Sequence, residues 1–187
     1  NSHLRTITTF TALPLFDIKP TIAYQLTQDL SIGVGADIYT FASFFGEGHA
    51  ELQSISPGGL VPAGGKLEFN GKDTAAGFNV GGLYTALRNG SGQPIANLAV
   101  VYRSQATLHL DGAFSANGVK IQDATTTLVL PQVITGGIAL WPIRNPEREW
   151  KVELNVDYVG WKSVRSLDIR LENGFVIPQP QNWKSTY

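Results

Sequence analysis

Apolar and polar residues alternate with a period of two along most of the chain. The longest run covers residues 98–114, and its apolar face carries Leu98, Val100, Tyr102, Ala106, Leu108 and Leu110. The opposite face carries Arg103, Gln105, Thr107, His109 and Asp111. Successive side chains of a β-strand point to opposite faces, so this period predicts a strand. The run is about twice as long as an average soluble strand.

The same alternation recurs in residues 16–25, 30–41, 74–87, 95–111, 124–143 and 150–164, the last prolonged by 166–174. These segments predict about six strands. Short polar turns separate some of them, at about residues 27–29, 88–94 and 144–149. Longer loops are expected at about residues 42–73, at 112–123 and after 174, although "HAELQS" and "KLEFNG" within the first could extend the flanking strands. Tight turns thus lie at one end of the strands and long loops at the other.

One proline interrupts a predicted strand. Pro131 lies within residues 124–143, where the remaining residues favour extended structure. Proline has no backbone N–H and removes a hydrogen bond from the sheet. We therefore expect a bulge or kink at Pro131, at which strand pairing would break.

Long strands with one uncharged face indicate a membrane protein. Backbone groups in lipid must all be paired within the protein, so a sheet that crosses a membrane closes into a barrel. Strands of about 9–11 residues, with short turns at one end and long loops at the other, are typical of outer-membrane barrels. The sequence thus predicts an all-β, antiparallel transmembrane β-barrel, with residues 1–187 as a single segment of it. A soluble β-sandwich binding module remains an alternative, although its strands are usually shorter.

Composition excludes several other classes of protein. The chain has 187 residues, a formal net charge of −1 and no cysteine. Nucleic-acid binders usually show a basic footprint, which is missing. Without cysteine the chain has no disulfide, thiolate zinc site or cysteine nucleophile. Its three histidines lack metal-ligand spacing, and no nucleophile elbow is present, so we expect no enzyme, no metal and no cofactor.

Five segments, taken in order, carry a family resemblance. They are "KPTIAYQLTQDLSIGVGADIY", "GFNVGGLYTALRNG", "VVYRSQATLHLDG", "TLVLPQVITGGIALWPI" and "VELNVDYVGWKSV". Together they resemble the FadL/TodX family of transporters for long-chain fatty acids and hydrocarbons in the Gram-negative outer membrane. The resemblance implies a barrel of about 14 strands, of which this chain would supply roughly the fourth to the ninth. The family's N-terminal plug and its terminal strands would lie outside the chain.

The resemblance also implies function and partners. We expect passive uptake of a hydrophobic ligand, either a fatty acid or a hydrocarbon, by a monomer surrounded by outer-membrane lipids. A general porin or a purely structural barrel is the alternative. A porin needs a strongly charged constriction, whereas the inward positions here mix apolar and amide side chains, which favours hydrophobic cargo.

Candidate site residues follow from inward strand parity. The polar set is Arg103, Asp37, Asn79, Gln105, Glu153 and Asp157, and the apolar set is Leu83, Val101 and Trp161. Arg103 has two interpretations: it binds a ligand carboxylate, or it forms a structural ion pair, because a buried cation needs a partner. The apolar set would contact either ligand or plug. In the loop, Phe41, Phe44 and Phe45 would dock oily substrates or pack on one another.

Overall fold

The computed structural model describes residues 8–43, 48–59, 61–178, 181 and 183–186, and nearly all of its regular structure is β. The strands are β1 (Thr8–Ala12), β2 (Leu15–Ile18), β3 (Thr21–Gln25), β4 (Leu30–Phe41), β5 (Ala50–Ile55), β6 (Lys66–Lys72), β7 (Ala75–Arg88), β8 (Pro94–Arg103), β9 (Ala106–Ala116), β10 (Val119–Leu130), β11 (Val133–Asn145), β12 (Arg148–Val159), β13 (Ile169–Leu171) and β14 (Val176–Ile177). A short 3-10 helix, η2 (Trp161–Ser163), follows β12. No helix among the described residues is long and apolar enough to cross a membrane.

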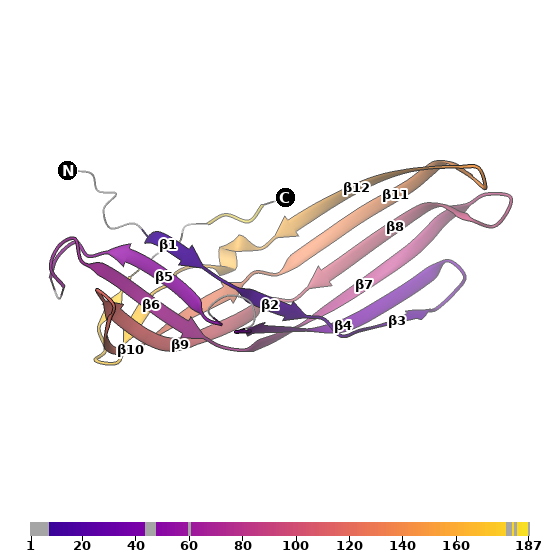
Figure 1. Cartoon of the computed structure of the whole chain (residues 1–187). Coiled ribbons are helices and arrows are strands. Elements are labelled where there is room, and N and C mark those ends of the chain that lie inside the picture. Colours follow the sequence, from indigo (N-terminus) through magenta and orange to yellow (C-terminus); the bar gives the residue numbers. More distant parts are fainter. Residues whose placement is uncertain (1–7, 44–47, 60, 179–180, 182, 187) are drawn as a thin grey trace.

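The strands form two sheets, and the chain runs from one sheet to the other several times. Sheet A has the order β1-β5-β6-β9-β10-β13-β14, and sheet B has the order β12-β11-β8-β7-β4-β2, with β3 also paired to β4. Neighbouring strands within each sheet are antiparallel. The chain passes directly between the sheets at β6–β7, β8–β9 and β10–β11, each time across a gap of two residues. Figure 1 shows sheet B at the right and sheet A at the left.

These gaps divide the predicted strands. The predicted strand over 95–111 is interrupted at Ser104 and Gln105, and the one over 124–143 is interrupted at Pro131 and Gln132. The predicted strands over 30–41 and 74–87 match β4 and β7 closely. The short turns are confirmed, because hairpins close at residues 26–29, 89–93 and 146–147.

Neither predicted internal loop is a loop throughout, because both segments contain strands of sheet A. In the first, β5 and β6 lie at the two stretches that were expected to be able to extend the strands. Residues 42–73 contain the β5–β6 hairpin, whose connecting segment includes Gly58, Gly59 and Gly64 with positive φ. Residues 112–123 contain the end of β9 and the start of β10, joined by a tight turn at Asn117 and Gly118 with φ of 49° and 81°. Asn-Gly is the sequence that such a two-residue turn favours, because both residues need a positive φ.

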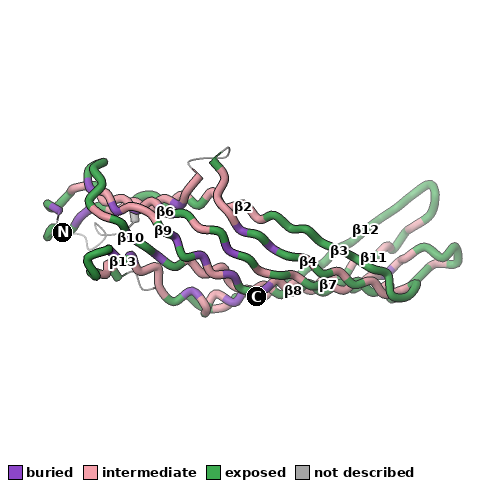
Figure 2. The backbone as a smooth tube through the Cα atoms, turned by 90° about the horizontal axis from the view of Figure 1, so that it is seen from below, coloured by how far each residue is buried: buried purple, intermediate pink, exposed green. Residues whose placement is uncertain are grey.

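The break after Arg103 reverses the two faces of the chain. In β8 the side chains of Leu98 and Val100 are 42% and 54% exposed, whereas in β9 those of Leu108 and Leu110 are 0% and 3% exposed. These four residues share one parity in the sequence, so the prediction that they share one face is wrong. Figure 2 shows the outcome, with buried positions concentrated on sheet A. The same reversal occurs between β10 and β11, at Pro131.

The two sheets also differ in which face is apolar. The core is formed mainly by side chains on the inner face of sheet A. It includes Phe69, Leu108, Leu110, Phe114, Ile169 and Leu171, all buried. Between these positions the outward side chains of β6 and β9 are mostly polar, among them Glu68, Asn70, His109 and Asp111. Sheet B instead exposes apolar side chains in every long strand, including Ile32, Val34, Val80, Val100, Ile138, Val152 and Leu154.

Candidate functional site: a cavity where the two sheets meet

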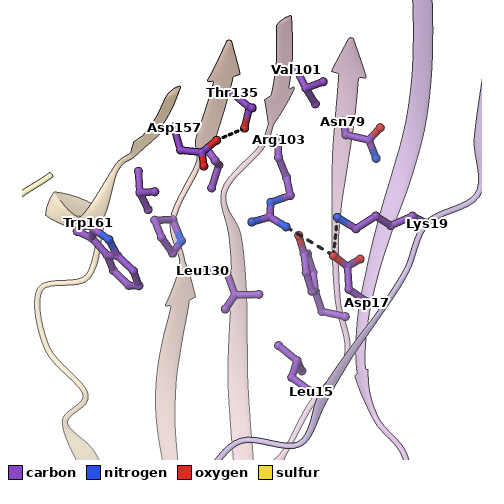
Figure 3. A pocket seen from close by; sticks show the side chains of 14 residues that line it. Leu15, Asp17, Lys19, Asn79, Val101, Arg103, Leu130, Thr135, Asp157 and Trp161 are labelled. Carbon is purple, nitrogen blue, oxygen red and sulfur yellow. Dashed lines mark hydrogen bonds and ion pairs between the residues drawn. The ribbon is translucent and has the colours of Figure 1, made fainter. Parts of the chain in front are cut away.

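A cavity lies along the line of strand breaks. It encloses about 780 Å³ and is lined by Leu15, Asp17, Lys19, Tyr39, Asn79, Val101, Arg103, Leu130, Pro131, Val133, Thr135, Asp157, Val159 and Trp161. Both sheets contribute, because Arg103 ends β8 and Leu130 ends β10, while Val133 begins β11. The side chains of a strand normally alternate between two faces, but at the breaks this alternation is interrupted. Consecutive residues can therefore face the cavity, as Leu130 and Pro131 do. Figure 3 shows this arrangement from close by.

Most of the cavity wall is apolar. Leu130, Pro131 and Val133 line it at the β10–β11 break. Val159 lines it from the end of β12, and Trp161 from the start of η2. The Trp161 ring also makes an edge-to-face contact with Trp183, with ring centroids 4.8 Å apart. An apolar wall with a few placed polar groups is typical of a site for a small hydrophobic molecule.

One side of the cavity is ionic. Lys19 Nζ lies 2.9 Å from Asp17 Oδ2 and 3.6 Å from Asp37 Oδ1, and Arg103 Nη1 lies 3.8 Å from Asp17 Oδ2. Asp37 is fully buried behind the wall and accepts a hydrogen bond of 2.8 Å from Asn79 Nδ2. The four charged groups therefore balance, two carboxylates against two cations.

A third carboxylate stands on the opposite wall. Asp157 on β12 accepts a hydrogen bond of 2.6 Å from the Thr135 hydroxyl on β11. In Figure 3 the Arg103 side chain extends into the space between Asp157 and Asp17. Arg103 is thus the cation that reaches furthest toward the apolar part of the cavity in this view.

The breaks are closed by hydrogen bonds that replace those of the sheet. Ser104 N donates to Phe78 O at 2.9 Å, and Phe78 N donates to the Ser104 hydroxyl oxygen at 2.9 Å. At the other break Gly160 N donates to Gln132 O at 3.0 Å. Buried backbone groups need such partners, so the strands can stop here without leaving these groups unpaired.

The structure brings most of the predicted inward residues together. Asn79, Val101, Arg103, Pro131, Asp157 and Trp161 line the cavity, and Asp37 supports it from behind. Leu83 lies in a separate shallow hollow of sheet B that shares Asn79 and Val101 with the cavity. Glu153 is exposed and forms an ion pair with Lys151 instead.

Gln105 is misplaced by the parity argument. Its side chain is exposed and does not line the cavity, because the break beside it reverses the faces of β9. Of the three phenylalanines, Phe41 packs partly buried against the core of sheet A rather than standing free in a loop. Phe44 and Phe45 lie outside the described residues.

Sequence reasoning missed several lining residues. Asp17 and Lys19 lie two residues apart and therefore on one strand face. Such a pair of opposite charges could have indicated an ion pair on the inward side. Tyr39 had inward parity as well. For Leu15, Leu130 and Val133 no signal existed, since their positions depend on where the strands break. No cluster of potential metal ligands is found among the described residues.

Comparison with known proteins gives a family and a fold. The profile of the family described as "Outer membrane protein transport protein (OMPP1/FadL/TodX)" matches residues 3–187. The fold resembles the Ralstonia pickettii toluene transporter TbuX, with 18% identity, 91% of this chain and 49% of that chain covered, and a TM-score of 0.65. A Pseudomonas aeruginosa FadL homologue gives 12% identity, 91% and 44% coverage, and a TM-score of 0.69.

A third solved structure, a TodX mutant described as a monoaromatic hydrocarbon channel, gives 16% identity, 91% and 48% coverage, and a TM-score of 0.63. No curated protein matches the chain. The chain thus spans about half the length of each of these structures.

Proposed function

Because the chain belongs to the OMPP1/FadL/TodX family of outer membrane transport proteins, we propose that it forms part of a channel for passive uptake of hydrophobic compounds. The observation that carries this proposal is the cavity at the sheet junction, with its apolar wall and its small ionic side. A water-filled porin would place polar groups at those inward positions. The cavity contributes binding and passage, and no catalytic step is proposed.

We place sheet B in the membrane and sheet A outside it. The outward face of sheet B carries exposed isoleucine, valine and leucine in successive strands, which suits contact with lipid tails. The outward face of sheet A carries mostly polar side chains, which suits water. On this placement the cavity lies at the level where the lipid-facing band ends.

The complete barrel is proposed to have about 14 strands, which fits an even count within the range of bacterial barrels. The open edge of sheet B, where β12 is paired on one side only over most of its length, supports further strands but does not set their number. An open edge in lipid would leave backbone groups unpaired. We further propose a monomer, in which residues 1–187 form one segment of the barrel and a plug from outside this segment contacts its inner face.

The finer question is whether the ligand is a fatty acid or a neutral hydrocarbon. We propose a fatty acid, because Arg103 extends into the cavity and its only ion pair among the described residues is a long one, 3.8 Å from Asp17. Charge-assisted pairs of arginine with carboxylate are usually about 2.7–2.9 Å long. Arg103 therefore has donors to spare for a ligand carboxylate, while the apolar wall takes the alkyl chain.

An uptake assay on cells that make the full-length protein tests both the proposed uptake of hydrophobic compounds and the proposed role of Arg103. We would compare labelled hexadecanoic acid with labelled hexadecane for the wild type, for Arg103→Gln and for Arg148→Gln, an exposed arginine in β12 that serves as control. We expect Arg103→Gln to reduce uptake of the acid severalfold and to leave hexadecane unchanged. Equal loss of both compounds in Arg103→Gln alone would overturn its role as carboxylate receptor.

The porin alternative is tested by what the purified protein carries. The full-length protein would be extracted from outer membranes and its bound small molecules identified by mass spectrometry, beside a porin prepared in the same way. We expect an enriched fatty acid or hydrocarbon. No enrichment over the porin, together with no ligand-dependent uptake in the cell assay, would overturn the proposed transport of hydrophobic compounds.

A further inference from the structure

We propose that Asp17 is an internal competitor for Arg103. In this proposal its carboxylate holds the Arg103 guanidinium while the cavity contains no anionic ligand, and a ligand carboxylate takes its place. The inference rests on the proposed function, because it concerns how the same cavity admits a fatty acid. It adds a residue that sets the preference for acids over neutral compounds.

The contact between Arg103 and Asp17 is incompletely formed. Arg103 Nη1 lies 3.8 Å from Asp17 Oδ2, which is within ion-pair range but too long for a good hydrogen bond. The other oxygen, Asp17 Oδ1, is buried and has no hydrogen-bond partner among the described residues. A guanidinium and a carboxylate can form two parallel hydrogen bonds, and here that pairing is only approached. Arg103 can therefore move toward Asp17 or toward the cavity.

Lys19 allows Asp17 to release Arg103. Its ammonium lies 2.9 Å from Asp17 Oδ2, so Asp17 keeps a cationic partner when Arg103 turns away. Without Lys19 the release would leave a partly buried carboxylate unpaired, which is costly. Lys19 is also drawn toward Asp37, 3.6 Å away, whose carboxylate is fixed by the hydrogen bond from Asn79. Lys19 is thus occupied on both sides, and Arg103 is the cation left to exchange partners.

The charge count favours the same conclusion. Asp17 and Asp37 balance Lys19 and Arg103, so the ionic side is neutral without ligand. Asp157 faces the cavity from β12 with a further negative charge. An entering carboxylate meets this excess of negative charge, so removal of the Asp17 charge should make entry of an acid easier and leave entry of a neutral molecule unaffected.

The test measures binding to the full-length protein in detergent. Equilibrium dialysis at pH 8 would use labelled hexadecanoic acid as probe and labelled hexadecanol as the neutral control of equal length. We expect Asp17→Asn to bind the acid severalfold more tightly and the alcohol as the wild type does. Asp17→Glu, whose longer side chain brings the carboxylate closer to Arg103, should bind the acid more weakly. These opposite shifts keep the test valid even if one of the two variants does not fold.

A double variant identifies the cation that is released. In Asp17→Asn combined with Arg103→Gln, the gain for the acid should disappear. If the gain persists, Lys19 and not Arg103 has been released, and the proposal is overturned. Equal changes for acid and alcohol in Asp17→Asn would overturn it too, because Asp17 would then only shape the cavity. If Arg103→Gln alone leaves the preference for the acid intact, the proposed carboxylate receptor fails separately.

Discussion

Asn79 donates a hydrogen bond of 2.8 Å to Asp37, and this contact ties β7 to a carboxylate on β4 that has no exposed surface. The second carboxylate oxygen, Asp37 Oδ2, has no partner among the described residues. Asp37 therefore depends on Asn79 and on Lys19, 3.6 Å away, for its interactions. The pair forms the rear support of the cavity wall.

We expect Asn79→Ala to destabilise the full-length protein by about 1–3 kcal/mol, because it removes a partner from a buried charged group. The midpoint of heat-induced unfolding in detergent measures this effect. Asn155→Ala is the matched control, since Asn155 is an exposed residue on an outer strand of the same sheet. Equal stability of the two variants would mean that the contact with Asp37 contributes little.

The Ser104 hydroxyl should matter more than most surface hydroxyls. It accepts the hydrogen bond of Phe78 N at 2.9 Å in place of a backbone carbonyl. Ser104→Ala leaves that N–H without its partner, and we expect a loss of about 1 kcal/mol in the free energy of unfolding. Ser115→Ala on β9, whose hydroxyl has no hydrogen bond among the described residues, should leave the unfolding midpoint unchanged.

Gly112 is required where β9 pairs with Gly71 of β6. A Cβ built on Gly112 would lie 1.6 Å from Asn70 O, which is backbone and cannot move without disturbing the sheet. We expect Gly112→Ala to cost at least about 1–3 kcal/mol and to lower the yield of folded protein. Gly136→Ala in β11 meets no atom within 4 Å and should fold normally. Proteolysis of the variants in intact cells would reveal an opened sheet A.

Filling the cavity should block every ligand regardless of charge. Val101 and Val100 are neighbours on β8, but Val101 lines the cavity and Val100 is exposed on the outward face. We expect Val101→Trp to reduce uptake of hexadecanoic acid and of hexadecane alike, and Val100→Trp to reduce neither. An acid-selective loss in Val101→Trp would indicate that the two compounds take separate routes.

The stability of sheet A should respond to acid through Glu68. A hydrogen bond from Lys66 is the largest cause that lowers the pKa of Glu68, and burial opposes it, while Asn70 and His49 add smaller lowering effects. A lowered pKa in the folded state means that charged Glu68 stabilises the fold above its unfolded pKa of about 4.3. That contribution is lost as the pH falls through the lowered pKa.

Glu68→Gln should therefore unfold at a lower temperature than the wild type at pH 7, by an amount that corresponds to less than about 1 kcal/mol for a partly exposed pair. The difference should shrink as the pH is lowered toward 3 and vanish below the lowered pKa. Glu172→Gln, an exposed carboxylate near β13, serves as control. A difference that is constant with pH would contradict an origin in the charge of Glu68.

The sequence was sufficient to predict the all-β antiparallel structure, the short turns and the family, and the family is confirmed. It was not sufficient for the break at Ser104 and Gln105. Apart from Ser104 at the break itself, the even-numbered positions from Leu98 to Leu110 are apolar, for two different reasons. In β8 they lie on the exposed outward face, and in β9 they pack inside the core of sheet A. A pattern of apolar and polar residues does not distinguish these two environments. Ser104 interrupts the apolar face at the break, but one polar residue does not by itself indicate that the faces reverse.

Other parts of the site had partial signals. Pro131 identified a place where pairing stops, for the physical reason that it lacks a donor, and the gap between β10 and β11 lies there. The Asn-Gly turn at residues 117–118 was present in the sequence, but the surrounding glycine and polar residues resembled a loop. Which inward residues meet in one cavity depends on the level of each break, and that level is a property of the whole sheet rather than of any one strand.

At the level of the strand breaks the outer surface of the molecule changes from apolar on sheet B to mostly polar on sheet A. The cavity lies at that same level. A fatty acid lodged there would keep its head beside Arg103 and its tail among Leu130, Val133 and Trp161. Because Val133 pairs with Arg103 across β11 and β8, the head and the start of the tail would lie at one level of the barrel wall. The cavity would thus hold a fatty acid at the boundary between the apolar and the polar part of the outer surface.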